Sequence, residues 1–352
     1  MNPFYFQLNT KIMKVLYAIQ GTGNGHLSRA RDIIPLLKKY CDLDLLVSGT
    51  QSQVQLPYEI KFQYKGFSFA YNQRGGIHYG KSAFNNFSFR LIKEILQVPI
   101  KDYDLIINDF EPVSAWAARL RNVPCIALGH QAAFQSALTP RPRRRHLFGE
   151  FVLRNYAPAN QAIGFHFLSY DHFIFPPVIR GDIRHSQPEN KGHYTVYLPA
   201  IRDEVLIRLL SQIMHVNWQV FSRYAKESYW ERNVWVRPIA NTSFVNSLVS
   251  CEGIFTGAGF ESPAEAIYLG KKLFVVPIMG QYEQQCNAAA LAKLGVPIAQ
   301  RVNQTIIPKL KTWVEEDQHI EMDFPDQTEE IIAGIFSGKD SLIKKKAIHA
   351  MV

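Results

Sequence analysis

Short runs of hydrophobic residues alternate along this chain with longer segments in which hydrophobic residues recur every three or four positions. Runs at 14–20, 43–48 and 104–108 have the length and the uniform hydrophobicity of strands buried on both faces. The segment 27–40 between two of them has the spacing of an amphipathic helix. Because parallel strands need crossover helices, this alternation predicts an α/β fold with doubly wound sheets.

The pattern is interrupted once, where Pro176 and Pro177 lead into the polar stretch 181–192, as in an interdomain linker. Before the linker we expect further strands at 124–128 and 163–168 and helices at 83–97 and through 116–120. After it we expect strands at 193–198, 218–222, 234–236, 253–256 and 272–276, and helices at 203–214, 284–294 and 329–336. The predicted organisation is one domain over 13–178, a second over 179–335 and a basic tail over 336–352.

Length and charge narrow the possible partners. At about 150 residues per domain, 352 residues fit two domains. A net charge of +9 suits nucleic acid, an anionic membrane surface or anionic substrates. The chain carries no nucleic-acid motif and no interleaving of aromatic and basic residues, so no nucleic-acid partner is expected.

Cysteine spacing and hydrophobicity bear on the compartment. The four cysteines form no CxxC pair, which argues against a zinc site and favours a reducing cytosol. No apolar run reaches the ~18 residues of a membrane span, and the N-terminus has no arginine-led signal core. We therefore expect a cytoplasmic protein. Residues 1–12 are either an extension or upstream of the true start, Met13.

The second half contains a glycine turn between a strand and a helix, at Gly257, Ala258 and Gly259. Glycines let the backbone approach a ligand closely, and the free N–H groups of a helix start suit a phosphate. Ser262, just after the turn, is expected to cap the helix, to contact phosphate, or both.

Acidic and amide side chains near this turn suit a sugar nucleotide. Glu265 is expected to accept both ribose hydroxyls, although Ser262 and Glu265 also have the spacing of a capping box. Glu283 and Gln284 pair a carboxylate with an amide, which fits the vicinal hydroxyls of a sugar; alternatively they only begin a helix. Together these residues predict a site for a nucleotide diphosphate with a sugar attached.

A second glycine turn follows the first strand, at Gly21 to His26. His26 replaces the third glycine of a dinucleotide fingerprint, and Ser48 and Gly49 stand where its acidic residue belongs, which argues against NAD. The helix dipole is expected to lower the pKa of His26 so that it acts as a base; the alternative is a polar cap. Gly23, Asn24 and Gly25 are weaker candidates for phosphate or acceptor contacts.

A base needs an acid to orient it, and Asp109 ends a strand of the same sheet. The alternative is that Asp109 caps the next helix, ahead of Pro112. Glu111 and His130 lie at similar strand ends and are weaker candidates for contacts with phosphate or acceptor, or are solvated loop residues.

These residues together resemble the GT-B glycosyltransferases, in the branch that holds the peptidoglycan N-acetylglucosaminyltransferase (family 28) and the UDP-glycosyltransferases (family 1). The likeness covers about residues 14–335. Its most specific part runs from Gly257 to Ala288. The Gly25-His26 turn resembles the catalytic-histidine turn of the family, and Asp109 with the following Trp116-Ala117-Ala118 resembles the strand and helix of its partner acid.

The resemblance implies two Rossmann-like domains facing each other across a cleft, with the acceptor in the first and the donor in the second. It implies that His26 is the base, that the backbone near Ile239 contacts the nucleobase, and that this base is uracil. Two departures affect the phosphates: Gly257 replaces a histidine, and 199–202 replaces a glycine-rich loop. We therefore expect Arg202 or Arg237 to assist the helix dipole.

The expected reaction is an inverting sugar transfer without a metal or other cofactor, since no DxD pair ends a strand. One alternative is a hydrolase in which His26 activates water, because some relatives with that activity carry a turn like Gly25-His26-x-x-Arg29. Another is a nucleotide-sugar-binding protein without activity. The apolar helix at 83–97 and the basic loop at 141–146 suggest a hydrophobic or lipid-linked acceptor and peripheral contact with the inner face of an anionic membrane. The alternatives are a helix of the core and a solvated run of charges.

Overall fold

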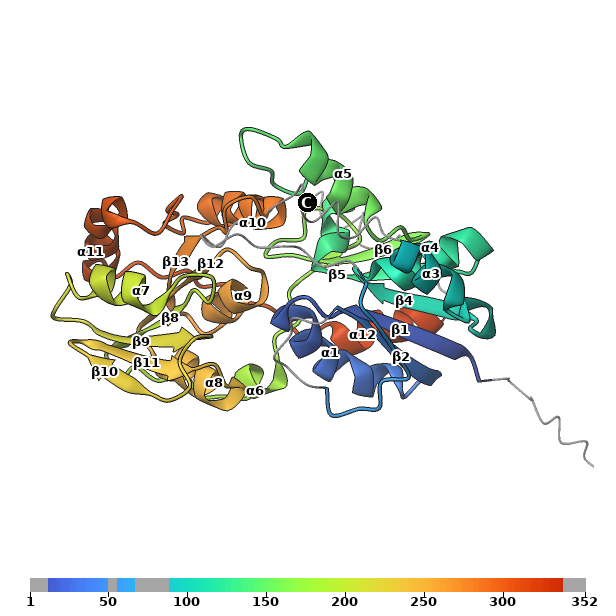
Figure 1. Ribbon diagram of the computed structural model, residues 1–352, viewed down its shortest axis with the longest axis horizontal. Helices are drawn as coiled ribbons and strands as arrows, with labels where there is room; N and C mark the ends of the chain where they lie inside the picture. The colour runs from blue at the N-terminus through green and yellow to red at the C-terminus, as the bar shows by residue number, and fades with distance from the viewer. Residues whose placement is uncertain (1–11, 50–55, 67–88, 338–352) are drawn as a thin grey trace, which may run out of the picture.

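The computed structural model describes residues 12–49, 56–66 and 89–337, and two parallel sheets form its framework (Figure 1). The first sheet has the strand order β3-β2-β1-β4-β5-β6-β7, and all its pairs are parallel. Its strands are β1 (Lys14–Gln20), β2 (Asp42–Ser48), β3 (Phe62–Tyr64), β4 (Leu105–Asp109), β5 (Cys125–Gly129), β6 (Gln161–Phe165) and β7 (Ile174–Phe175).

Four α-helices and two 3-10 helices belong to this first sheet among the described residues. They are α1 (Asn24–Leu37), α3 (Phe89–Gln97), η1 (Ile100–Asp102), α4 (Pro112–Arg121), η2 (His130–Gln135) and α5 (Leu147–Asn155). Residues 83–88 of the expected helix 83–97 lie outside the described residues. The sheet is hydrophobic on both faces: every residue of β4 is buried, as the uniform apolar runs predict.

The second sheet has the order β10-β11-β9-β8-β12-β13 and is parallel except for the edge strand β10. Its strands are β8 (His193–Tyr197), β9 (Asn217–Ser222), β10 (Tyr229–Glu231), β11 (Val234–Pro238), β12 (Gly253–Gly257) and β13 (Lys272–Val276). The helices of this half are α6 (Gly181–Arg184), α7 (Asp203–Leu210), α8 (Asn241–Ser250), α9 (Glu261–Tyr268), α10 (Tyr282–Lys293), η3 (Gln304–Ile306) and α11 (Ile307–Glu315).

The last described helix, α12 (Thr328–Phe336), returns to the first domain and lies beside α1 (Figure 1). The Phe336 ring stacks on Tyr40 with the centroids 5.5 Å apart, and Lys39 pairs with Glu329 at 2.7 Å. The predicted boundary, which gives 179–335 to the second domain, is therefore wrong at its end. The apolar side chains of α12 pack on the first domain, and the described chain crosses between domains twice.

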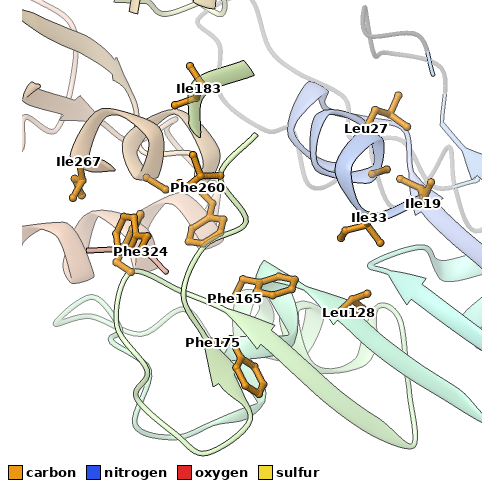
Figure 2. Close-up of a cluster of buried hydrophobic side chains, with 14 of the residues drawn as sticks. Ile19, Leu27, Ile33, Leu128, Phe165, Phe175, Ile183, Phe260, Ile267 and Phe324 are labelled. Atoms are coloured by element: carbon orange, nitrogen blue, oxygen red, sulfur yellow. The ribbon is translucent and has the colours of Figure 1, made fainter. Parts of the chain in front are cut away.

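A continuous hydrophobic core joins the two domains. It includes Ile33 and Phe165 from the first domain and Phe260 and Phe324 from the second (Figure 2). Phe260 precedes α9 and lies 5.1 Å from the Phe167 ring, centroid to centroid. This packing sets the carboxyl ends of the two sheets against each other.

The strand order reverses between β1 and β4 in the first sheet and between β8 and β12 in the second. Open α/β sheets bind ligands at such points, beyond the carboxyl ends of the strands. Both glycine turns of the sequence follow strands at these points, namely β1 and β12.

Candidate functional site

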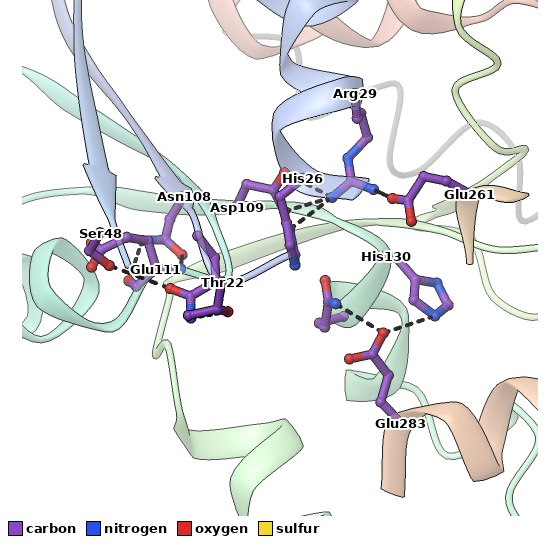
Figure 3. A network of polar contacts seen from close by, with 12 residues as sticks. Thr22, His26, Arg29, Ser48, Asn108, Asp109, Glu111, His130, Glu261 and Glu283 are labelled. Carbon is purple, nitrogen blue, oxygen red and sulfur yellow. Dashed lines mark hydrogen bonds and ion pairs between the residues drawn. The ribbon is translucent and has the colours of Figure 1, made fainter. Parts of the chain in front are cut away.

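His26 and Asp109 meet where the first sheet reverses its strand order. His26 lies in the first turn of α1, and Asp109 is the last residue of β4, which pairs with β1. His26 Nδ1 lies 2.8 Å from Asp109 Oδ1 (Figure 3). Since a carboxylate only accepts, Nδ1–H donates and Nε2 is left free to take a proton.

Arg29 completes this cluster, although it is not among the site residues predicted from the sequence. One helical turn after His26, its buried Nη2 donates to both carboxylate oxygens of Asp109, at 2.7 and 2.8 Å. Its Nη1 donates to Glu261, the first residue of α9 in the second domain. A chain of charges thus crosses the domain interface. Its position three residues after His26 indicates that both side chains lie on the same face of the helix, and this is the sequence pattern that points to Arg29.

Burial and charge oppose each other in this cluster. Burial favours a neutral Asp109, but Arg29 and His26 outweigh it and lower the pKa of Asp109. Burial also favours a neutral His26, yet the charge of Asp109 and its hydrogen bond raise the pKa of His26 above the ordinary 6.5. The expectation that the helix dipole lowers the pKa of His26 is therefore wrong, because the adjacent carboxylate dominates.

Two glycines make this close arrangement possible. A Cβ atom on Gly25 would clash with the Glu261 carboxylate, and one on Gly129 would lie 2.5 Å from Asp109 Oδ1. Phe110, directly after Asp109, has φ +55° in the left-handed region, which is unusual for a residue of its size. Such backbone strain gathers at sites where geometry matters.

Glu111, rather than Asp109, caps the helix after β4. Its two carboxylate oxygens accept from the N–H groups of Val113 and Ser114, each at 2.7 Å, and the residue is fully buried. The cap interpretation of Asp109 is therefore wrong. The expected contact of Glu111 with phosphate or acceptor is not supported either, because helix α4 uses both of its oxygens.

A cavity of about 460 Å³ opens at the carboxyl ends of β8, β12 and β13. The expected donor residues that line it are Arg202, Gly257, Gly259, Ser262 and Gln284. Ala258 is buried instead, and its carbonyl oxygen accepts from the amide of Asn287 at 3.1 Å. The Gln284 side-chain oxygen accepts from the N–H of Ile278 at 2.9 Å, which leaves its NH₂ group for a ligand.

A second cavity of about 340 Å³ lies between α1 and the second domain, lined among others by Asn24, Gly25, Ile239, Ser262 and Glu265. Ile239 uses its N–H to bond the Ser222 carbonyl oxygen at 3.2 Å, so only its carbonyl group is left for a base. Gly23 is the residue before α1 and does not line this cavity.

Glu265 is buried and paired. Arg180, from the segment between the domains, donates to both of its carboxylate oxygens, one of them at 2.7 Å. The alternative capping box does not form, because α9 begins at Glu261 and has no side-chain cap. Glu265 also lines the smaller cavity, and each of its oxygens keeps a second lone pair beyond the bond to Arg180.

His130 and Glu283 meet at the interface between the domains (Figure 3). The buried His130 ring lies 2.9 Å from the Phe165 carbonyl oxygen and 2.8 Å from Asn287 Oδ1. Glu283 Oε1 accepts from Gln131 at 3.1 Å and lies 4.0 Å from His130 Nε2. His130 is thus an interdomain contact. The expected phosphate contact of Arg237 is wrong, since Arg237 lines a different cavity.

Within 12–49, 56–66 and 89–337, no group of three or more histidine, cysteine or acidic side chains is placed to hold a metal ion. No helix in that part of the chain is both long enough and apolar enough to cross a membrane.

Two facing Rossmann-like domains with their site between the sheet ends define the GT-B class of glycosyltransferases. UGT89C1 from Arabidopsis thaliana, complexed with UDP, is 14% identical at a TM-score of 0.57, covering 96% of this chain and 99% of its own. UGT2 from Phytolacca americana, complexed with UDP-2fluoro-glucose and pterostilbene, is 12% identical with a TM-score of 0.55. The match covers 96% of this chain and 98% of UGT2. The glycosyltransferase SnogD from Streptomyces nogalater is 12% identical with a TM-score of 0.51. The match covers 96% of this chain and 100% of SnogD.

The sequence profile described as "Glycosyl transferase family 1" matches residues 13–315. The chain therefore belongs to glycosyl transferase family 1, and it is an enzyme that transfers sugar from a nucleotide sugar. No curated protein sequence matches the chain.

Proposed function

We propose that this enzyme transfers a sugar from a UDP-sugar to an acceptor hydroxyl with inversion, using His26 as general base and no metal ion. The observation that carries the proposal is the 2.8 Å contact between His26 Nδ1 and Asp109 Oδ1. It fixes the tautomer in which Nε2 is the basic atom. The other ring nitrogen points away from Asp109 (Figure 3).

In the proposed reaction, the acceptor hydroxyl loses its proton to His26 Nε2 as its oxygen attacks the anomeric carbon of the donor. Attack from the face opposite the diphosphate breaks the bond to the leaving oxygen and inverts the configuration. Asp109 stabilises the imidazolium that forms. Arg29 keeps Asp109 ionised, because its guanidinium contacts both carboxylate oxygens.

We assign the donor to the second domain and the acceptor to the first, where His26 lies. The diphosphate is proposed to lie at Gly257, Gly259 and Ser262, where the first N–H groups of α9 stabilise the charge of the leaving nucleotide. Ala258 is buried and contributes backbone shape only. Arg202 lines the same cavity and supplies a positive charge.

The remaining donor contacts follow the two cavities. Ile239 and Glu265 line the smaller one and are assigned to the nucleobase and the ribose. Glu283 and Gln284, in the first turn of α10, are assigned to the transferred sugar. Uridine is favoured because the similar UGT89C1 is described in complex with UDP and with UDP-L-rhamnose.

A hydrophobic or lipid-linked acceptor is supported by the surface of α5. Leu147, Phe148 and Phe151 on this helix are exposed, and the first of them exposes 85% of its surface. The basic loop that contains Arg143, Arg144 and Arg145 leads directly into this helix. Exposed apolar side chains beside several cations suit the interface of an anionic membrane.

The test is release of free nucleotide from a panel of nucleotide sugars, with a candidate acceptor extract present and absent. The wild-type enzyme is compared with His26→Ala and with His215→Ala, which removes an exposed histidine before β9. Acceptor-dependent release from one donor, lost only with His26→Ala, supports the proposal. Equal release of free sugar without an acceptor would instead establish hydrolysis, and donor binding without any release would indicate a binding protein.

A further inference from the structure

One face of the edge of the second sheet carries a cavity of about 380 Å³ that is separate from the cleft. Residues of β9, β11 and α8 line it. The neighbouring edge strand, β10, lies on the side of the second sheet that faces away from the first domain (Figure 1). The lining includes Gln219, Trp230, Trp235 and Arg237. None of its residues lines either cavity at the cleft.

Two tryptophans that line this cavity stack on each other, so each ring covers one face of the other. The rings of Trp230 and Trp235 are parallel within 2°, with their centroids 5.6 Å apart. Trp230 exposes 59% of its surface, although a large aromatic side chain is normally buried. An exposed indole in a cavity provides a flat apolar platform for a ligand of matching shape.

Arg237 brings a positive charge to the same cavity. Its guanidinium lies 4.2 Å from the centroid of the Trp235 ring and 5.2 Å from that of Phe221, and it donates to Gln219 Oε1 at 3.1 Å. No carboxylate pairs with it in the part of the chain that the structure describes. Burial without a counter-ion lowers the pKa of Arg237, so the charged guanidinium lacks a partner that an anionic ligand supplies.

The rest of the lining is polar and carries no negative charge among the described residues. Asn217 and Asn246 supply neutral donors and acceptors, and Lys191 adds a second cation, paired with Glu189 at 2.7 Å. A ligand that fits therefore combines a flat face, several hydroxyl-like groups and a negative charge.

We propose that this cavity binds an acidic saccharide, a pyranose unit that carries a carboxylate or a phosphate. The apolar face of the ring lies on the Trp230 indole, the ring hydroxyls bond the amide and hydroxyl side chains, and the acidic group pairs with Arg237. The neutral hydrogen-bonding groups of the lining suit the several hydroxyls of a saccharide, and a nucleotide is the alternative that the test distinguishes. The site holds a glycan away from the cleft, independently of the donor.

The test is a titration of the full chain with trigalacturonic acid, in which tryptophan fluorescence and calorimetry measure binding. Neutral maltotriose and uridine monophosphate are titrated in parallel as comparison ligands. We expect saturable binding of the acidic trisaccharide, weakened at least tenfold by both Trp230→Ala and Arg237→Gln. Arg237→Lys keeps the charge and should lose less affinity. Arg232→Gln removes a neighbouring charge that does not line the cavity and should bind like wild type.

Three results would overturn the proposal. The first is no binding of the acidic trisaccharide, and the second is binding that is unchanged by both variants. The third is tighter binding of uridine monophosphate that depends on Arg237, which would make the cavity a nucleotide site. Circular dichroism of each variant establishes that it is folded, so a loss of binding is read as a loss of the site.

Discussion

Arg29 and Asp109 form a buried ion pair in which one guanidinium nitrogen contacts both carboxylate oxygens, at 2.7 and 2.8 Å. Asp109 Oδ1 also contacts His26 Nδ1, so the base and the arginine share one acceptor. The other end of Arg29 contacts Glu261 of the second domain. The position of the second domain is thereby linked to the electrostatics of the proposed base, His26.

Replacement of Arg29 by methionine should raise the pKa of His26 further, because the positive charge of Arg29 lowers that pKa. The acidic limb of the activity profile should move to higher pH. Loss of one partner of a buried pair should also cost about 3–5 kcal/mol of unfolding free energy, measured in urea. Arg29→Lys keeps the charge and serves as the control. An acidic limb at the wild-type position in a folded Arg29→Met enzyme would contradict the linkage.

Wild-type activity should rise with pH through a midpoint above the 6.5 of an ordinary histidine. The reason is that a base must be unprotonated, and Asp109 holds the proton on His26 to higher pH. The measurement is kcat/KM over pH 5–9 with saturating acceptor. If activity reached half its maximum at pH 6.5 or below, another group, or the burial of His26 alone, would control the acidic side of the pH profile.

Asp109→Asn should reduce kcat by roughly 10²–10⁴-fold, the contribution expected of an oriented general base. The variant removes the charge that raises the pKa of His26, so its residual activity should show an acidic limb at lower pH than wild type. This shift has the opposite sign to that of Arg29→Met. A purely structural role of Asp109 would lower activity at every pH without moving the limb.

The strands and the His26–Asp109 pair were accessible from the sequence because both rest on local rules. Buried parallel strands read as apolar runs, and their carboxyl ends gather at one edge. Asp109 and His26 follow neighbouring strands, so proximity followed from the predicted sheet order. Helix α8, by contrast, contains polar residues in most turns and gave no clear period.

The contacts across the domain interface were not accessible in the same way. Glu261 and Arg180 are separated by many residues from the partners they bond, and no spacing rule relates them. The sequence shows the helix of Glu265 but not the arginine that pairs with it. Similarly, α12 reads as a closing helix of the second half, whereas its packing partner α1 lies at the start of the chain.

The exposed face of α5 should anchor the enzyme to anionic membranes. Phe148→Ser with Phe151→Ser, or Arg143, Arg144 and Arg145 all changed to Ala, should reduce sedimentation with vesicles of 30% phosphatidylserine at low salt. The first removes apolar insertion and the second removes about 1 kcal/mol per arginine near the surface. Arg223→Ala on the second domain is the charge control. Unchanged sedimentation of both α5 variants would exclude this surface.

The assignment of Glu265 to the ribose predicts a difference between UDP and its 2′-deoxy analogue. Wild type should bind UDP about tenfold more tightly, because a hydrogen bond to a charged group contributes about 1.5–3 kcal/mol. Glu265→Gln should lose most of that discrimination, and calorimetry with both ligands measures it. Glu252→Gln breaks another ion pair of the same domain, with Lys272, and should discriminate like wild type. Equal discrimination by Glu265→Gln and wild type would mean that Glu265 only anchors Arg180, and the ribose would then have to be held by other residues of the smaller cavity.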